Sequence, residues 1–371
     1  MEHIVEREKT VPVLARTDVV VAGAGIAGTI AAISAARHQA KTILIDRFGS
    51  PGGNMGPGVW AAGTLHLALK DRRFPDESAL VNRCGMGGIP EEFIRRAVDS
   101  RPIARDIPLE VREELERTHY NLDGYRLGAA GYPMDAVVCT HVAFQMLEEA
   151  GVEWLLSAYV CDPVLDGSRV TGVFAETKSG RVAILGKVVV DATGEADVAF
   201  RAGAPTVNCK SPGVGLWFSI QGVDRARFLE YLAHDGIDPA DIEWANRTLP
   251  GAKFAANEAQ ADEPSQFADV IYMYYDEKVH RNCDVPYRML LPKGVDGLIA
   301  AGRSGMVYGP NLRARYSVML DAQAAGVAAA LCAADGIQPR QLDVRKLQRI
   351  LWQHGCPLGD RVRLKELGLV G

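Results

Sequence analysis

The chain has 371 residues, of which 48% are hydrophobic and 23% are charged, an ordinary composition for a soluble globular protein. This length provides for a large core and about two domains. The formal net charge is -5 and the basic residues are scattered rather than grouped beside aromatic residues, so we expect no nucleic-acid partner.

Leader, membrane and metal signals are also missing from the sequence. The opening MEHIVEREKT has no apolar stretch, which argues against a secretory signal. The most apolar segment, 318–334, contains Asp321 and Gln323 and therefore predicts a buried helix rather than a membrane span. The seven cysteines form no CxxC pair or Cys/His cluster, so we expect no metal site, reduced thiols and a cytoplasmic location.

The first predicted elements, within residues 18–46, are a strand, a glycine-rich turn, a helix and a second strand. Val19-Val20-Val21 is typical of a buried parallel strand. Glycines follow in GxGxxG spacing at Gly23, Gly25 and Gly28, before an alanine-rich helix. The second strand, 42–45, leads directly to Asp46.

This combination predicts a dinucleotide site. The first glycine of such a motif allows a tight turn, the second lets the backbone approach a pyrophosphate, and the third lets helix and strand pack closely. The helix N-terminus presents free N–H groups to phosphate, and Asp46 can accept hydrogen bonds from a ribose. The alternative is a plain glycine-rich connection between a strand and a helix.

The segment after Asp46 is rich in glycine and proline through residue 58, which predicts either a surface loop or a backbone passing close to a flat ligand. Between residues 71 and 134 the sequence predicts short polar helices at 72–81, 91–99 and 109–118.

The periodic pattern becomes clearer from Asp135, which can cap a helix that ends at Gly151. The strands predicted next are 152–160, then 170–177 and 182–185 as a hairpin, and finally 187–191 as a buried strand. Residues 205–290 carry many of the aromatic side chains and suit a substrate domain. A strand at 297–301, a loop to Arg315, a helix at 317–334 and an amphipathic helix at 341–354 complete the chain.

Three separated motifs carry a family resemblance: GAGIAG at 23–28, DATGEAD at 191–197 and LIAAGRSG…AAG across 298–326, with PYRMLLP at 286–292. Together they resemble the FAD-dependent oxidoreductases of the glutathione-reductase superfamily, in the branch related to succinate dehydrogenase and fumarate reductase flavoproteins. The resemblance implies an α/β fold with a Rossmann-like FAD-binding domain, discontinuous in sequence, and a smaller α+β substrate domain.

On this basis we expect an FAD-binding domain from 16–70, 135–207 and 285–335. A helical insertion would occupy 71–134, the substrate domain 208–284 and a C-terminal helical tail 336–371.

Carried over by position, the resemblance assigns pyrophosphate contacts to the GxGxxG glycines, ribose contacts to Asp46, and backbone contacts to the adenine from Val160. It also implies that the helix beginning near Ser317 points toward the pyrimidine edge of the flavin. Two positions depart from the family: Asp46 replaces the more usual glutamate, and Asn54-Met55-Gly56 replaces a threonine-containing loop. The expected cofactor contacts are Gly23, Gly25, Ile26, Ala27, Gly28, Asp46, Arg47, Gly52, Gly53, Asn54, Val160, Ala192, Thr193, Gly194, Gly302 and Arg303.

The function implied is hydride transfer between a small organic substrate and FAD. The alternatives are an oxidase or monooxygenase that uses oxygen, and a non-catalytic FAD-binding subunit. An NAD-dependent enzyme with a single Rossmann unit would leave the second and third motifs unexplained. Because the sequence shows only one dinucleotide unit, the electrons would come from a bound organic substrate or from a reductant that binds transiently. An electron acceptor is a further expected partner, and the chain has the option of forming a homo-oligomer.

The catalytic candidates are two arginines and one histidine. Arg313 matches the arginine that the family places after its AGR motif, and Arg315 follows two residues later. Either could hold an acidic substrate, although a surface or phosphate contact is the alternative for Arg313. His280 precedes the return to the FAD-binding domain and could move a proton, whereas a surface histidine is the simpler interpretation.

Overall fold

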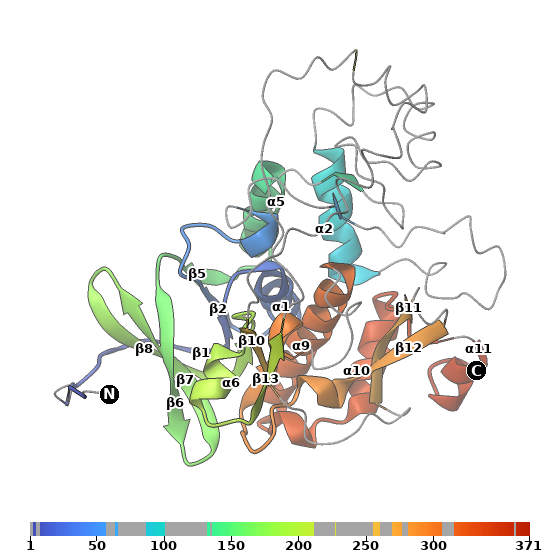
Figure 1. Ribbon diagram of the computed structural model, residues 1–371. Helices are drawn as coiled ribbons and strands as arrows, with labels where there is room; N and C mark the ends of the chain where they lie inside the picture. The colour runs from blue at the N-terminus through green and yellow to red at the C-terminus, as the bar shows by residue number, and fades with distance from the viewer. Residues whose placement is uncertain are drawn as a thin grey trace.

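The computed structural model describes residues 3–4, 8–56, 64–65, 87–100, 132–133, 136–210, 227, 255–259, 269–276, 281–305, 315–359 and 361–371. Its largest sheet has seven strands (Figure 1). The order across the sheet is β5, β2, β1, β8, β7 and β6, and β13 also pairs with β8. The strands of this sheet are β1 (Val13–Ala22), β2 (Thr42–Ile45), β5 (Glu153–Leu155), β6 (Tyr159–Asp166), β7 (Arg169–Thr177), β8 (Gly180–Asp191) and β13 (Leu298–Ala300).

Strand β8 joins a parallel part of the sheet to an antiparallel part. Its first half pairs antiparallel with β7, from Gly180 to Leu185. Its last three residues pair in parallel with β13, in the register Ala300 to Asp191, while β1 pairs in parallel with β8 from Ala183 to Asp191. The carboxyl ends of β1, β2, β8 and β13 therefore meet at one edge, where ligands bind in open α/β sheets.

Helices cover one face of the parallel strands. The central pair is α1 (Ile26–Arg37) and α9 (Arg315–Asp335), which lie against each other on one side of the sheet, to its right in Figure 1. Their approach is close, because a Cβ added to Gly326 of α9 would lie 2.3 Å from the Ala31 oxygen of α1. The Ser34 hydroxyl also donates to the Gln323 carbonyl oxygen at 2.9 Å, so small residues and one buried hydrogen bond hold the two helices together.

The alternation of side chains along β1 and β2 divides the core into two layers. Val19, Val21 and Leu44 face the helices, whereas Val20 and Ile43 face a second cluster formed with β7 and the short helix α6 (Asp197–Arg201). Each fully buried aliphatic side chain of this kind contributes roughly 1.5–3 kcal/mol relative to an exposed one. Because both faces of these strands are buried, their sequences are continuous runs of apolar residues.

The remaining elements lie around this core. The helices are α2 (Gly88–Asp99), α5 (Ala136–Glu149), α10 (Val344–Gln353) and α11 (Arg361–Glu366). Three two-stranded sheets pair β3 (Thr64–Leu65) with β4 (Tyr132–Pro133), β9 (Thr206–Lys210) with β10 (Ala255–Ala259), and β11 (Val270–Asp276) with β12 (Arg281–Pro286).

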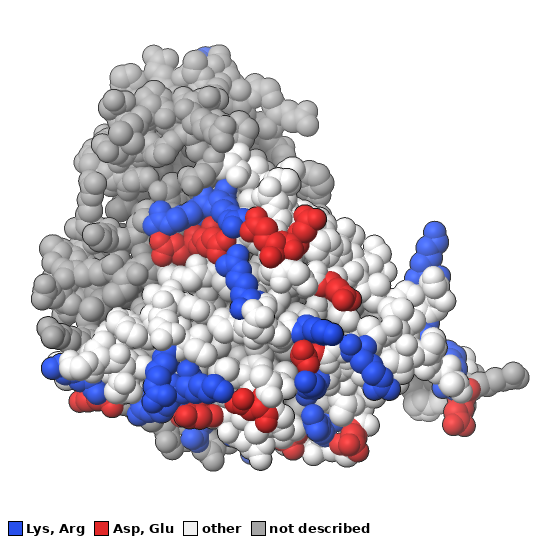
Figure 2. Space-filling model, turned by 180° about the vertical axis from the view of Figure 1, so that it is seen from behind, with Lys and Arg blue, Asp and Glu red and all other residues white. Residues whose placement is uncertain are grey.

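Ion pairs connect α1, α2 and α5 at the surface. Arg37 of α1 binds Glu92 of α2 at 2.5 Å, and Arg96 of α2 binds both Glu92 and Glu149 of α5 at 2.7 and 2.8 Å. Figure 2 shows acidic and basic side chains intermixed on the face in view. Each pair is at least partly exposed to water, which screens the charges, so it contributes little to stability.

Helix α9 is the one described helix long and apolar enough to cross a membrane by length and composition. However, 89% of its apolar window is buried inside the protein, and its Asp321 and Gln323 side chains are fully enclosed. The apolar character of α9 therefore reflects its central place in the core.

Three of the predicted strands differ from the structure. The expected strand 152–160 is two strands, because Ser157 adopts a φ of 55° and the chain passes from β5, beside β2, to β6, beside β7. The expected strands 182–185 and 187–191 are one continuous strand, β8, which passes through Gly186. The predicted helices 72–81 and 109–118 lie outside the described residues, and Asp135, the expected cap of α5, does so too.

Candidate cofactor site

A cavity of about 370 Å³ lies at the carboxyl ends of β1, β2 and β8. Its lining comes from the glycine turn, the loop after β2, the turn after β8, the short 3-10 helix after β13 and the beginning of α9. The lining residues are Gly23, Gly25, Ile26, Ala27, Asp46, Arg47, Phe48, Gly53, Asn54, Ala192, Thr193, Gly194, Arg303 and Val318.

In the glycine turn after β1, one glycine allows close packing of α1 and another leaves the backbone open to the cavity. A Cβ on Gly28 would lie 1.6 Å from the Gly23 oxygen, so only glycine lets α1 pack against the turn. By contrast, a Cβ on Gly25 would meet no atom within 4 Å, because that position faces the cavity. No described side chain caps α1 at Gly25, so the free N–H groups and positive end of the helix are directed to this space.

Asp46 organises the end of β2. Its Oδ2 accepts a hydrogen bond from the Ala24 N–H at 2.5 Å, and its Oδ1 accepts one from the Phe48 N–H at 2.7 Å. Burial raises the pKa of the Asp46 carboxyl, while these two donors act in the opposite direction. Each carboxylate oxygen has a second lone pair, which keeps acceptor capacity for a ribose hydroxyl.

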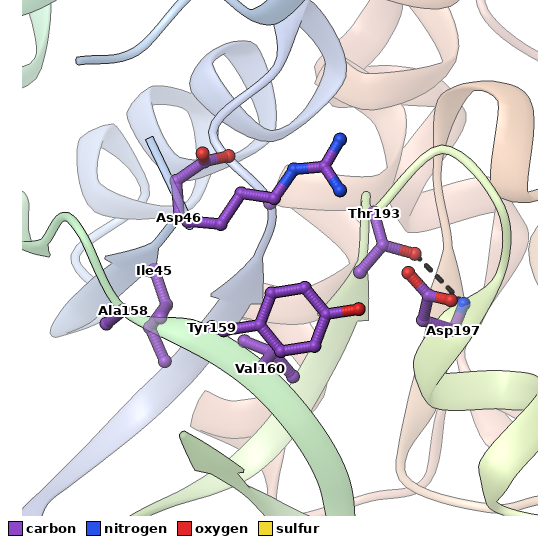
Figure 3. Close-up of a pocket in the computed structure, with 9 residues that line it drawn as sticks. Ile45, Asp46, Ala158, Tyr159, Val160, Thr193 and Asp197 are labelled. Carbon is purple, nitrogen blue, oxygen red and sulfur yellow. Dashed lines mark hydrogen bonds between the residues drawn. The ribbon is translucent and has the colours of Figure 1, made fainter. Parts of the chain in front are cut away.

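A second, smaller pocket adjoins Asp46 (Figure 3). Val160 lines it, and its contact with the adenine stays a prediction. Tyr159 extends from β6 toward Thr193 and Asp197. The Thr193 hydroxyl accepts a hydrogen bond from the Asp197 N–H at 3.0 Å. Tyr159 and Asp197 were not among the predicted contacts, because nothing in their local sequence indicates which way they face.

The paired glycines after β2 approach the glycine turn directly. Gly52 donates its N–H to the Ala24 oxygen at 2.7 Å, and a Cβ on Gly53 would lie 2.8 Å from the Gly25 Cα. Gly53 and Asn54 then line the cavity beside Gly25. The 47–58 segment is thus packed against the glycine turn over its described part, which ends at Gly56.

The AGR segment has an arrangement that sequence reasoning missed. The Gly302 N–H donates to the buried Asp321 Oδ1 at 3.1 Å, which directs that amide into the protein. Burial places the pKa of Asp321 well above its usual value. Arg303 lines the cavity, and its guanidinium donates to the Gly194 oxygen and to Glu195, the latter at 2.8 Å. Gly28, Gly52 and Gly302 do not line these two cavities, so their direct cofactor contacts stay a prediction.

The structure describes one of the three catalytic candidates. Arg315 is the first residue of α9, one turn before the cavity-lining Val318. Burial lowers the pKa of the Arg315 guanidinium, and the nearby Cys139 thiol acts in the opposite direction. Arg313 and His280 lie outside the described residues.

These features fit a flavin dinucleotide. The uncapped α1 N-terminus and the open space at Gly25 suit a pyrophosphate, Asp46 suits a ribose, and the pocket beside Val160 suits an adenine. Among the described residues, no group of three or more His, Cys, Asp or Glu is arranged to hold a metal ion.

Solved structures with a similar fold include several flavoproteins. A flavocytochrome c3 fumarate reductase is 16% identical with a TM-score of 0.42, covering 86% of this chain and 79% of that chain. A 3-ketosteroid-delta4-(5alpha)-dehydrogenase from Rhodococcus jostii RHA1 is 15% identical with a TM-score of 0.43, covering 87% of this chain and 97% of that chain. Sdh1 from Mycobacterium smegmatis is 16% identical with a TM-score of 0.43, covering 88% and 69%. Likenesses this distant carry no information about the reaction.

The comparison with curated proteins gave no match. The sequence profile of the FAD dependent oxidoreductase family matches residues 18–283 and 273–351, which together span most of the chain and include the glycine turn, the DATGEAD segment and the AGR segment. The chain therefore belongs to the FAD dependent oxidoreductase family and is an FAD-binding oxidoreductase.

Proposed function

We propose that the protein transfers a hydride between a small organic substrate and FAD, with the electrons passing to or from a separate acceptor. The observation that carries this proposal is the cavity at the sheet edge, in a chain of an FAD-dependent family. When bound, FAD supplies the redox chemistry, and the chain supplies binding and orientation.

The described residues account for binding along the cavity. The α1 N-terminus offers N–H groups for the pyrophosphate, and Asp46 offers carboxylate oxygens for the ribose. Val160 and Tyr159 offer the walls of the adenine pocket. Thr193, Gly194 and Arg303 close the opposite wall of the larger cavity.

For the substrate, we propose that Arg313 and Arg315 hold an acidic group and that His280 moves a proton. Arg315 supports this assignment because it begins the helix whose Val318 lines the cavity. An arginine partly withdrawn from water binds a carboxylate more strongly than an exposed one, since the surrounding dielectric constant is lower.

The first experiment is anaerobic mixing of the FAD-loaded protein with a panel of small hydroxy acids, saturated carboxylic acids and amines. Bleaching of the flavin absorbance, followed by turnover with an artificial acceptor, is the expected result. Oxygen consumption with the same substrate, without turnover on the acceptor, would favour an oxidase or monooxygenase. Flavin that no compound reduces, in a protein that retains FAD, would favour a binding subunit and contradict the proposal.

Arg313→Ala and Arg315→Ala test the substrate assignment once a substrate is known. We expect FAD to remain bound, the KM for an acidic substrate to rise at least tenfold, and the KM for a neutral analogue to change little. An equal change for the acidic and neutral compounds would contradict a role in binding the acidic group.

A further inference from the structure

Two cavity-facing turns come from distant parts of the chain. The turn after β8 contributes Thr193 and Gly194, and the short 3-10 helix after β13, Gly302–Ser304, contributes Arg303. The two strands are neighbours in the sheet, with Ala300 opposite Asp191. Backbone pairing fixes the strands, but it ends before the turns begin, so another interaction has to set the distance between the turns.

The Ser304 hydroxyl supplies that interaction. Its side chain is fully buried. It accepts hydrogen bonds from the Gly194 N–H at 2.9 Å and the Ala196 N–H at 3.2 Å. It donates its own proton to Asp191 Oδ1 at 3.3 Å. One hydroxyl thus uses its donor and both of its lone pairs between the two segments.

Asp191 anchors the same network from the end of β8. Its Oδ1 also accepts from the Thr193 N–H at 3.1 Å and the Thr193 hydroxyl at 2.7 Å, and its Oδ2 accepts from the Ala199 N–H at 2.9 Å. Burial raises the pKa of this carboxyl, whereas the Ala199 and Thr193 donors lower it. The buried acid therefore fixes the first turn, and Ser304 ties the second turn to it.

We infer that Ser304 is a positioning residue for FAD, which sets the spacing between Gly194 and Arg303 across the cofactor cavity. Ser304 itself is absent from the cavity lining, so it acts through the two turns. Removing its oxygen leaves the buried Ala196 N–H and the partly buried Gly194 N–H without their acceptor, and the turn would shift to relieve this loss. The Arg303 contacts with Gly194 and Glu195 would shift with it.

Ser304→Ala tests this inference, with Ser34→Ala as a matched control. Ser34 is equally buried, and its hydroxyl donates to a carbonyl oxygen where that of Ser304 donates to a carboxylate. It links α1 to α9 away from the cavity lining. FAD affinity is measured by titrating each apoprotein with FAD, and folding by thermal melting of the same samples. We expect Ser304→Ala to weaken FAD binding about tenfold or more, and Ser34→Ala to leave it within about twofold even where both melt lower.

Ser304→Cys completes the test, because a thiol is a weaker donor and acceptor at the same position. We expect its FAD affinity to lie between those of the wild type and Ser304→Ala. This variant also gives the answer if Ser304→Ala does not fold. Wild-type FAD affinity in a folded Ser304→Ala or Ser304→Cys protein would overturn the inference. Equal weakening in Ser34→Ala would do so as well, because it would reduce the effect to general loss of stability.

Discussion

Gly25 and Gly28 belong to one turn but tolerate a side chain to very different degrees. At Gly25 an added methyl group meets open space, with an ordinary negative φ of −62°. We therefore expect Gly25→Ala to fold with an unchanged apoprotein melting temperature. Its FAD affinity should fall at least tenfold, because the methyl group would occupy the space in which we propose that the pyrophosphate binds. Thermal melting and FAD titration on one preparation check both parts.

Gly28→Ala should act through folding instead. Its Cβ would lie 1.6 Å from a backbone oxygen, which no rotation of a side chain relieves. Overpacking of this kind costs about 1–3 kcal/mol or more, so we expect a lower melting temperature together with loss of FAD. Gly49→Ala is the control, because its nearest neighbour would be the Ser157 hydroxyl at 3.6 Å. A stable, FAD-free Gly28→Ala protein would contradict the packing role.

The glycine turn that lines the cavity could be predicted from the sequence, because its backbone geometry requires glycine at the positions of the GxGxxG motif. The role of Ser304 could not be predicted, because the sequence around a serine does not show whether its hydroxyl faces water or binds two amides from a distant part of the chain. The positions of Tyr159 and Asp197 in one pocket could not be predicted either, since they depend on how β6 and the turn after β8 meet in the fold.

At the scale of elements, the ends of α1 and α10 meet through two histidines. The His38 and His354 ring centroids are 5.2 Å apart, and His38 Nδ1 donates to the Ser34 oxygen at 2.7 Å. Burial lowers the pKa of His354 from its ordinary value of 6.5, with further contributions from His38 and Arg37. The contact therefore favours a neutral His354 in the folded protein.

This contact predicts a pH dependence of stability. Because the pKa of His354 is lower in the folded protein, the unfolded chain binds the proton first, and the free energy of unfolding falls as pH drops below about 6.5. His354→Gln should reduce this decline between pH 7 and pH 5, as measured by denaturant unfolding. His141→Gln is a control on the exposed side of α5. An unchanged pH profile in His354→Gln would show that the decline has another source.

Element boundaries were the least predictable feature. Apolar and polar residues alternate over 152–160 as they would in one strand, but Ser157 turns the chain between two strands of the sheet. A positive φ at this position could not be predicted, because serine rarely adopts one. The hairpin was predictable from the Lys178-Ser179-Gly180 turn. The passage of β8 through Gly186 was not, because glycine normally weakens a strand, whereas here it accommodates Val20, whose side chain would lie 2.8 Å from a Cβ.

Across the whole molecule, FAD should stabilise the fold because its predicted contacts join five segments of the chain: 23–28, 46–54, 160, 192–194 and 302–303. At a free FAD concentration of 100 times the Kd, the folded state gains about 2.7 kcal/mol. We expect the melting temperature of wild-type apoprotein to rise steadily with added FAD, and that of Gly25→Ala to rise only at much higher concentrations. Equal shifts in the melting temperatures of the two proteins would mean that the stabilising FAD binds at a site other than the cavity at Gly25.

The parallel pairing of β13 with β8 also has a consequence for how the protein is made. Residues 1–210 contain the glycine turn and most of the sheet, but β13, Arg303 and all of α9 come from 298–335. A growing chain that stops at residue 210 would leave uncovered the parts of the sheet and of α1 that α9 packs against, and it would lack Arg303 and Val318 in the cavity lining. Newly synthesised chains should therefore take up FAD only after residues 298–335 have left the ribosome, and until then chaperones or fast synthesis would have to prevent association.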